Sequence, residues 1–170
     1  MKKIVLTGPE SSGKTTMATE LATHYDTMWV PEYARTYLSS LERPYTEEDL
    51  RVIAKGQIEL EQRLARESGK LLICDTGLVV IKVWSEYKFG RCHQEITQLL
   101  QRHRHDLYLL MSPDIAWQAD PLRENPHDRD TIFELYLKTL QEFNLTYKVI
   151  KGNGPLRTQQ AITFIDQILE

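Results

Sequence analysis

A run of residues near the amino end has the composition and spacing of a phosphate-binding loop. Residues 8–15, Gly-Pro-Glu-Ser-Ser-Gly-Lys-Thr, match G-x-x-x-x-G-K-[ST] at every fixed position. Gly8 and Gly13 let the backbone turn so that successive N–H groups point inward, and the helix that follows adds the positive end of its dipole. The Lys14 ammonium can neutralise the outer phosphates, and the Thr15 hydroxyl can ligate Mg²⁺. The pattern therefore predicts that the chain binds a nucleoside triphosphate.

The predicted nucleotide site extends beyond the fixed positions of this motif, and its expected cofactors are ATP and Mg²⁺. The expected nucleotide contacts are Gly8, Glu10, Ser11, Ser12, Gly13, Lys14, Thr15, Thr16 and Arg157. A fortuitous glycine turn before a helix is the alternative. The apolar strand expected at 4–7 and the helical stripe expected at 14–25 disfavour it, because the motif requires both.

Asp75 is the expected partner of Thr15 at the metal. It ends the apolar run 71–75, and ligands bind beyond the carboxyl ends of strands in open α/β sheets. A carboxylate at that place can hold Mg²⁺ directly or through water. The alternative is that Asp75 caps a helix that begins near Thr76, since aspartate is a good N-cap residue. The sequence leaves both roles open.

Glu32 comes just after the short strand expected at 28–30. A carboxylate there can accept a proton from a substrate hydroxyl or bind a sugar. The alternative is an acid placed in the first turn of a helix, where it suits the helix dipole. Arg35 lies one helical turn later and can reach the same cleft. We therefore predict that Glu32 is catalytic and that Glu32, Tyr33, Arg35 and Asp75 contact the acceptor substrate.

The segment 120–128 is rich in proline and charged residues, which predicts an exposed, mobile loop. Arg123 lies within it and Arg129 directly follows it. Arginines on a closing lid stabilise the charge of a transferring phosphoryl group, and the lid excludes water. A solvated charged loop is the alternative. The predicted catalytic set is Lys14, Glu32, Asp75, Arg123 and Arg129.

Two aromatic pairs are candidates for binding a flat ring. Trp84 and Tyr87 stand one helical turn apart near the Asp75 end of the expected sheet, and Trp29 and Tyr33 form a similar pair. Such pairs can sandwich a ring, more favourably when the ring is cationic. Packing in the core is the alternative, because large aromatic side chains are usually buried. We predict that Trp84 and Tyr87 contact the substrate.

The rest of the chain alternates short apolar strands with amphipathic helices. The expected strands are 4–7, 28–30, 71–75, 106–111 and 147–150. Strands that are apolar on both faces and separated by helices predict a parallel sheet covered on both sides. We therefore predict an α/β, three-layer P-loop NTPase or kinase fold with about five parallel strands, forming one domain over residues 1–170 with a lid at 120–128.

Composition excludes several other classes of protein. The 170 residues include 21 basic and 24 acidic side chains, a balance that disfavours binding of nucleic acid. No apolar stretch is long enough for a membrane span or a signal peptide, so a cytoplasmic protein is expected. The two cysteines and five histidines lack metal-ligand spacing; Cys74 is expected in the core and the histidines on the surface. A small nucleoside is the expected partner, and a homo-oligomer stays open.

These motifs together resemble the ribosylnicotinamide kinase domain of the NadR family over nearly the whole chain. The resemblance is carried in order by residues 8–15, Glu32-Tyr33-Ala34-Arg35, Gln57, Asp75-Thr76, Trp84 with Tyr87, Asp120-Pro121-Leu122-Arg123 and Arg129. It implies the fold of nucleoside and nucleotide kinases. It also implies ATP-dependent phosphorylation of the 5′-hydroxyl of nicotinamide riboside to nicotinamide mononucleotide, a step of NAD biosynthesis.

By the same resemblance, Glu32 and Asp75 would face the ribose and the magnesium, and aromatic rings would stack on the cationic nicotinamide. The family has a tryptophan directly before the Glu-Tyr pair, whereas this chain has Pro31, with Trp29 two residues earlier. Which aromatic residue stacks on the base therefore stays open. The adenylyltransferase domain that usually precedes the kinase in NadR proteins is not expected here. The alternative functions are an ATP-binding regulatory P-loop ATPase and a kinase for another nucleoside or nucleotide.

Overall fold

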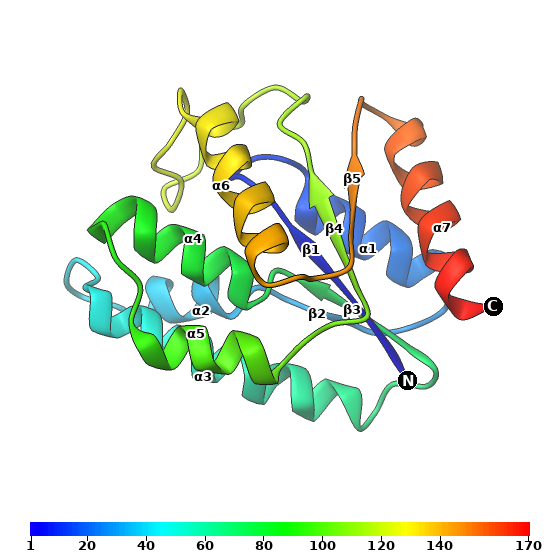
Figure 1. Cartoon of the computed structure of the whole chain (residues 1–170), viewed down its shortest axis with the longest axis horizontal. Coiled ribbons are helices and arrows are strands. Elements are labelled where there is room, and N and C mark those ends of the chain that lie inside the picture. Colours follow the sequence, from blue (N-terminus) through cyan, green and yellow to red (C-terminus); the bar gives the residue numbers. More distant parts are fainter.

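A five-stranded sheet runs through the middle of the computed structural model, which describes all 170 residues (Figure 1). Its strands are β1 (Lys2–Thr7), β2 (Trp29–Val30), β3 (Leu71–Asp75), β4 (Leu107–Met111) and β5 (Tyr147–Ile150). They lie in the order β2-β3-β1-β4-β5, and every neighbouring pair is parallel. The predicted parallel sheet of about five strands is therefore confirmed.

Helices cover both faces of this sheet. They are α1 (Lys14–His24), α2 (Tyr33–Ser39), α3 (Glu47–Ala65), α4 (Leu78–Phe89), α5 (Gln94–Arg102), α6 (Arg129–Glu142) and α7 (Pro155–Leu169). Helices α1 and α7 pack on one face and the other five on the opposite face, as Figure 1 shows. None of the helices combines the length and the apolar character that crossing a membrane would need.

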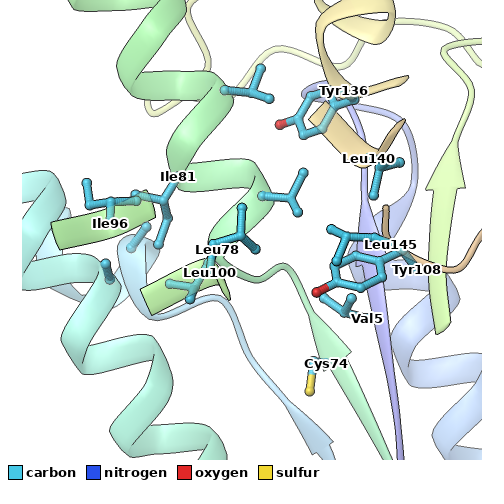
Figure 2. Close-up of a cluster of buried hydrophobic side chains, with 14 of the residues drawn as sticks. Val5, Cys74, Leu78, Ile81, Ile96, Leu100, Tyr108, Tyr136, Leu140 and Leu145 are labelled. Atoms are coloured by element: carbon cyan, nitrogen blue, oxygen red, sulfur yellow. The ribbon is translucent and has the colours of Figure 1, made fainter. Parts of the chain in front are cut away.

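The two cores explain why the strands lack polar alternation. Along β3, Leu71 and Ile73 pack toward α1 and α7, whereas Leu72 and Cys74 pack toward the other helices. Figure 2 shows this second cluster, with Cys74 near one end of it and Tyr136 near the other. Because successive strand residues point to opposite faces, a sheet covered on both sides needs apolar residues at nearly every position.

One sequence expectation about the surface is wrong. His105 is only 8% exposed, although all five histidines were expected on the surface. His105 lies two residues before β4 begins, and it packs against α3. Its Nε2 lies 2.9 Å from a carboxylate oxygen of Glu61 on that helix. The hydrogen bond explains how a polar ring is accommodated in the interior. The expectation that Cys74 lies in the core is correct.

Candidate active site

The connection from β1 to α1 has the tight turn that an anion-binding loop needs. Gly8 has φ 135°, and a Cβ there would lie 2.6 Å from the carbonyl oxygen of Met111. Gly13 has φ 82° and is the N-cap of α1. Both positions therefore require glycine. The strand, loop and helix expected around the motif are all present, so the N-terminus of α1 is open to an anion.

Lys14 lies folded over this loop. Its Nζ donates to the carbonyl oxygens of Gly8 at 2.9 Å and Pro9 at 2.7 Å. Burial lowers the pKa of the ammonium, and the carboxylates of Glu32 and Asp75 oppose that shift. A phosphate oxygen at the loop would compete with the two carbonyls for the same protons. Lys14 is thus held where a triphosphate would meet it.

Thr15 and Asp75 form a pair that could hold Mg²⁺. The Thr15 hydroxyl donates to Asp75 Oδ2 at 2.6 Å. Asp75 is 2% exposed, and its other oxygen, Oδ1, is buried without a hydrogen-bond partner. Burial raises the pKa of Asp75, although the Thr15 hydroxyl and Lys14 oppose the shift. A buried carboxylate oxygen with no partner beside a hydroxyl suits a cation that prefers oxygen ligands.

The capping alternative for Asp75 does not fit the observed helix. The N-cap of α4 is Gly77, two residues further along, and no side chain caps that helix. Asp75 instead belongs to the end of β3 and points toward Thr15 at the start of α1. Its position supports the metal-ligand interpretation over the capping one.

Glu32 lies at the start of α2 without making a capping bond. It is the N-cap residue by position, but its side chain caps no backbone N–H. One of its oxygens is 3.9 Å from Nε of Arg35. Burial raises the pKa of Glu32, Lys14 opposes the shift and Asp75 adds to it. A carboxylate with a raised pKa is suited to accepting a proton from a substrate hydroxyl.

A cavity of about 510 Å³ joins the loop to the region beyond α2 and α4. Many of the predicted site residues line it: Gly8, Glu10, Ser11, Ser12, Gly13, Lys14, Thr15, Thr16, Glu32, Arg35, Trp84, Tyr87 and Arg123. The residues that sequence spacing selected from four separate segments therefore meet at one cavity. Four predicted residues do not line it: Tyr33, Asp75, Arg129 and Arg157.

The second aromatic pair is used elsewhere. The ring of Tyr33 lies against Gly56 on α3, where even a Cβ would collide with it. Trp29 is partly buried and packs against the core on the α1 and α7 side. Neither ring faces the cavity, because Tyr33 turns toward α3 and β2 directs Trp29 into the opposite layer. Trp84 and Tyr87 are the aromatic candidates that remain.

Tyr45 is a cavity residue that the sequence analysis missed. Its ring meets Trp84 edge-to-face at 5.0 Å between centroids, and its hydroxyl accepts a hydrogen bond of 3.0 Å from Trp84 Nε1. It lies in the irregular connection between α2 and α3, directly after Pro44. The sequence feature that could have indicated Tyr45 is an aromatic residue next to a proline in a loop. Helix and strand periodicity gives no information about residues in irregular connections.

The predicted lid, 120–128, is the last part of the connection from β4 to α6 and contains neither helix nor strand. Its Asp120 accepts a hydrogen bond of 2.8 Å from Arg35, and Asp128 accepts one of 2.6 Å from the Tyr87 hydroxyl. Arg123 lines the cavity, and Arg129 donates to the carbonyl of Ser11 in the phosphate loop at 3.0 Å. Both predicted lid arginines thus lie at the phosphate end of the site.

Arg157 supports the phosphate loop from behind. It is 4% exposed, and its guanidinium donates to the carbonyls of Ser12 at 2.8 Å, Gly152 at 2.8 Å and Ser112 at 3.2 Å. Burial lowers its pKa, and Asp114 opposes the shift. These carbonyls occupy the guanidinium, and Arg157 does not line the cavity. Arg157 therefore braces three loops, whereas a direct contact with ATP was expected.

A parallel sheet with β1 at its centre and a glycine loop leading into α1 and lining the cavity define the class of P-loop nucleotide-binding proteins with a kinase-like fold. The family AAA_28, described as an AAA domain, matches residues 3–157. The chain belongs to this family.

The chain is similar to the trifunctional NAD biosynthesis/regulator protein NadR of Salmonella typhimurium. The two are 28% identical over 157 residues, which is 89% of this chain and 38% of that protein. The chain thus spans less than two fifths of the length of this relative. The resemblance to NadR that the motifs indicated is confirmed.

Solved structures of NadR share this fold. One, in complex with NR, has a TM-score of 0.79 and 24% identity, and covers 98% of this chain and 51% of its own. Another, in complex with NAD and AMP-PNP, has a TM-score of 0.78 and 22% identity over 98% of this chain and 49% of its own. At this level of identity the likeness establishes the architecture.

Proposed function

We propose that the chain is an ATP-dependent kinase that phosphorylates the 5′-hydroxyl of nicotinamide riboside to nicotinamide mononucleotide, a step of NAD biosynthesis. The similarity to NadR supports this proposal. The observation that carries it is the position of Glu32. Its carboxylate lines the same cavity as Lys14 and the phosphate loop, and its pKa is raised by burial. A donor site and a proton acceptor thus open into one space.

In this proposal the loop and Lys14 bind ATP, and Thr15 and Asp75 hold Mg²⁺. The bound cation would neutralise charge on the phosphates as the phosphoryl group moves. Arg123 and Arg129 add positive charge from the lid side. Phosphoryl transfer depends mainly on positioning and on such charge stabilisation.

Glu32 orients the ribose 5′-hydroxyl and takes its proton late in the transfer. Trp84 and Tyr87, joined by Tyr45, provide the aromatic surface for the base. A cationic pyridinium ring gains from aromatic faces and from the carboxylates of Glu32 and Glu124, which also line the cavity. We expect residues 1–170 to act as one kinase domain, in the cytoplasm where ATP is available.

A kinase for a nucleoside monophosphate is the second candidate, because Arg35 and Arg43 also line the cavity and could hold an acceptor phosphate. Both guanidiniums already have carboxylate partners, however. Arg35 bonds Asp120 at 2.8 Å, and Arg43 bonds both oxygens of Asp49, at 2.7 and 2.8 Å. An acceptor phosphate would have to displace these carboxylates, so the nucleoside is the better fit.

A panel of acceptors tests the proposal. The protein is incubated with ATP, Mg²⁺ and, one at a time, nicotinamide riboside, deoxyadenosine, thymidine and thymidine monophosphate, and products are weighed by mass spectrometry. A product one phosphate heavier is expected from nicotinamide riboside, and none from the Lys14→Ala variant. Lys70→Ala removes an exposed lysine away from the site and should match the parent. ATP hydrolysis without phosphorylation of any acceptor would favour a regulatory ATPase.

A further inference from the structure

The phosphate loop contains an acidic residue, Glu10, whose negative charge would repel a bound triphosphate. The loop amides, the N-terminus of α1 and Lys14 all favour anionic phosphates. Glu10 adds a negative charge to this same loop and lines the same cavity. Like charges repel, so a carboxylate beside a triphosphate needs hydrogen-bond donors that stabilise its charge. Glu10 is among the expected nucleotide contacts, but its carboxylate binds elsewhere.

The lid supplies those donors. The backbone N–H of Asn125 donates to Glu10 Oε2 at 3.0 Å. The backbone N–H of Glu124 donates to the same oxygen at 3.0 Å and lies 3.2 Å from Oε1. Two consecutive lid amides therefore converge on one carboxylate. Hydrogen bonds to a charged acceptor are stronger than bonds between neutral groups.

The neighbouring Ser11 binds residues on either side of the lid. Its hydroxyl oxygen accepts the backbone N–H of Gln118 at 2.9 Å, and its carbonyl accepts Arg129 Nη1 at 3.0 Å. Residues 10 and 11 thus contact the middle of the lid and the residues that flank it, Gln118 and Arg129. The Glu-Ser pair inside the phosphate loop forms a dock for the segment that covers it.

We propose that Glu10 is a positioning residue whose carboxylate docks the lid on the phosphate loop and so sets Arg123 over the cavity. Arg123 directly precedes the two docked amides and lines the cavity. A docked lid holds this arginine near the phosphates and keeps water from them. The kinetic consequence rests on the proposed kinase function, whereas the docking itself does not.

Hydrogen exchange tests the docking without any acceptor. In Glu10→Ala the amides of Glu124 and Asn125 should exchange roughly tenfold faster or more, because bonds to a charged group are lost. The melting temperature should stay that of the parent. Glu59→Ala removes an exposed acid on α3 and should leave lid exchange unchanged. Lid amides that stay as protected as in the parent would overturn the proposal, whatever the acceptor panel shows.

Kinetics provide the second measurement. Glu10→Ala should raise the ratio of ATP hydrolysed to nucleoside phosphorylated and lower kcat, with little change in ATP affinity. Glu10→Gln keeps the shape and one acceptor oxygen, so it should lie between the parent and Glu10→Ala and serves if the alanine variant fails to fold. A ratio equal to that of the parent in both variants contradicts the positioning role. Absence of phosphorylation by the parent protein itself counts against the kinase function only.

Discussion

Among single residues, Glu32 is the one whose environment connects most directly to chemistry. Burial raises its pKa, so its carboxylate protonates at a higher pH than an ordinary glutamate. A general base must be ionised, so kcat should fall as pH decreases through this raised pKa. Glu32→Gln should lose that dependence and cut acceptor phosphorylation by roughly a hundredfold or more, the usual size of a general-base contribution.

The control for Glu32→Gln is ATP binding, measured by calorimetry without acceptor. It should stay close to that of the parent, because Glu32 lies on the acceptor side of Lys14. A collapse of ATP affinity would assign Glu32 to the nucleotide or the metal. If neither ATP affinity nor turnover changes, Glu32 is only an acid at the start of a helix.

Replacement of Asp75 should affect the dependence on magnesium. Asp75→Asn keeps the shape but removes a charge from the oxygen pair beside Thr15, so half-maximal activity should need far more Mg²⁺ and turnover should fall by orders of magnitude. Because burial raises the pKa of Asp75, its charge is costly in the protein without metal. The melting temperature of the metal-free variant should therefore not decrease. A lower melting temperature with unchanged magnesium dependence would make Asp75 purely structural.

Among the elements, the lid is the one expected to change with ligands. Residues 120–128 lack regular structure, and hydrogen bonds from Arg35 and Tyr87 hold their acidic side chains. Both partners lie on elements that line the cavity. Trypsin cleavage after Arg123 should therefore slow when ATP and acceptor are both present. Equal cleavage rates with and without these ligands would show that residues 120–128 do not act as a lid.

The elements also show what the sequence can predict. The strands and the phosphate loop were predictable because local rules govern them: apolar runs, glycine spacing and the helix that follows. Arg157 and Tyr45 were not. Whether Arg157 faces ATP or the loop carbonyls depends on how α7 packs against α1 and β5. The place of Tyr45 depends on the path of an irregular connection. Such contacts come from tertiary packing, which one sequence does not encode in any short pattern.

Across the whole molecule, the buried carboxylate of Glu61 on α3 links stability to pH. Burial disfavours the charge on Glu61, but His105 at 2.9 Å and Lys3 at 2.8 Å outweigh burial and lower the pKa of Glu61 to about 2. The folded pKa lies below the unfolded value of about 4.3, so the stabilisation is present above that value and is lost as pH falls toward 2. Its size at neutral pH is roughly 2–3 kcal/mol.

Glu61→Gln tests this linkage by urea unfolding across pH. The variant should unfold more easily than the parent at neutral pH, and the gap in free energy of unfolding should narrow as pH falls from about 5 toward 3. A difference in free energy of unfolding that stays constant with pH would mean that folding does not change the pKa of Glu61.

A competition between nucleosides identifies the acceptor substrate of the kinase. Nicotinamide riboside, deoxyadenosine and thymidine are mixed in equal amounts with ATP, Mg²⁺ and the protein, and phosphorus NMR follows every new phosphate ester. We expect nicotinamide riboside to be consumed first and its new phosphorus to couple to the two protons of the 5′ carbon. Phosphate on another nucleoside, or inorganic phosphate alone, would contradict this expectation.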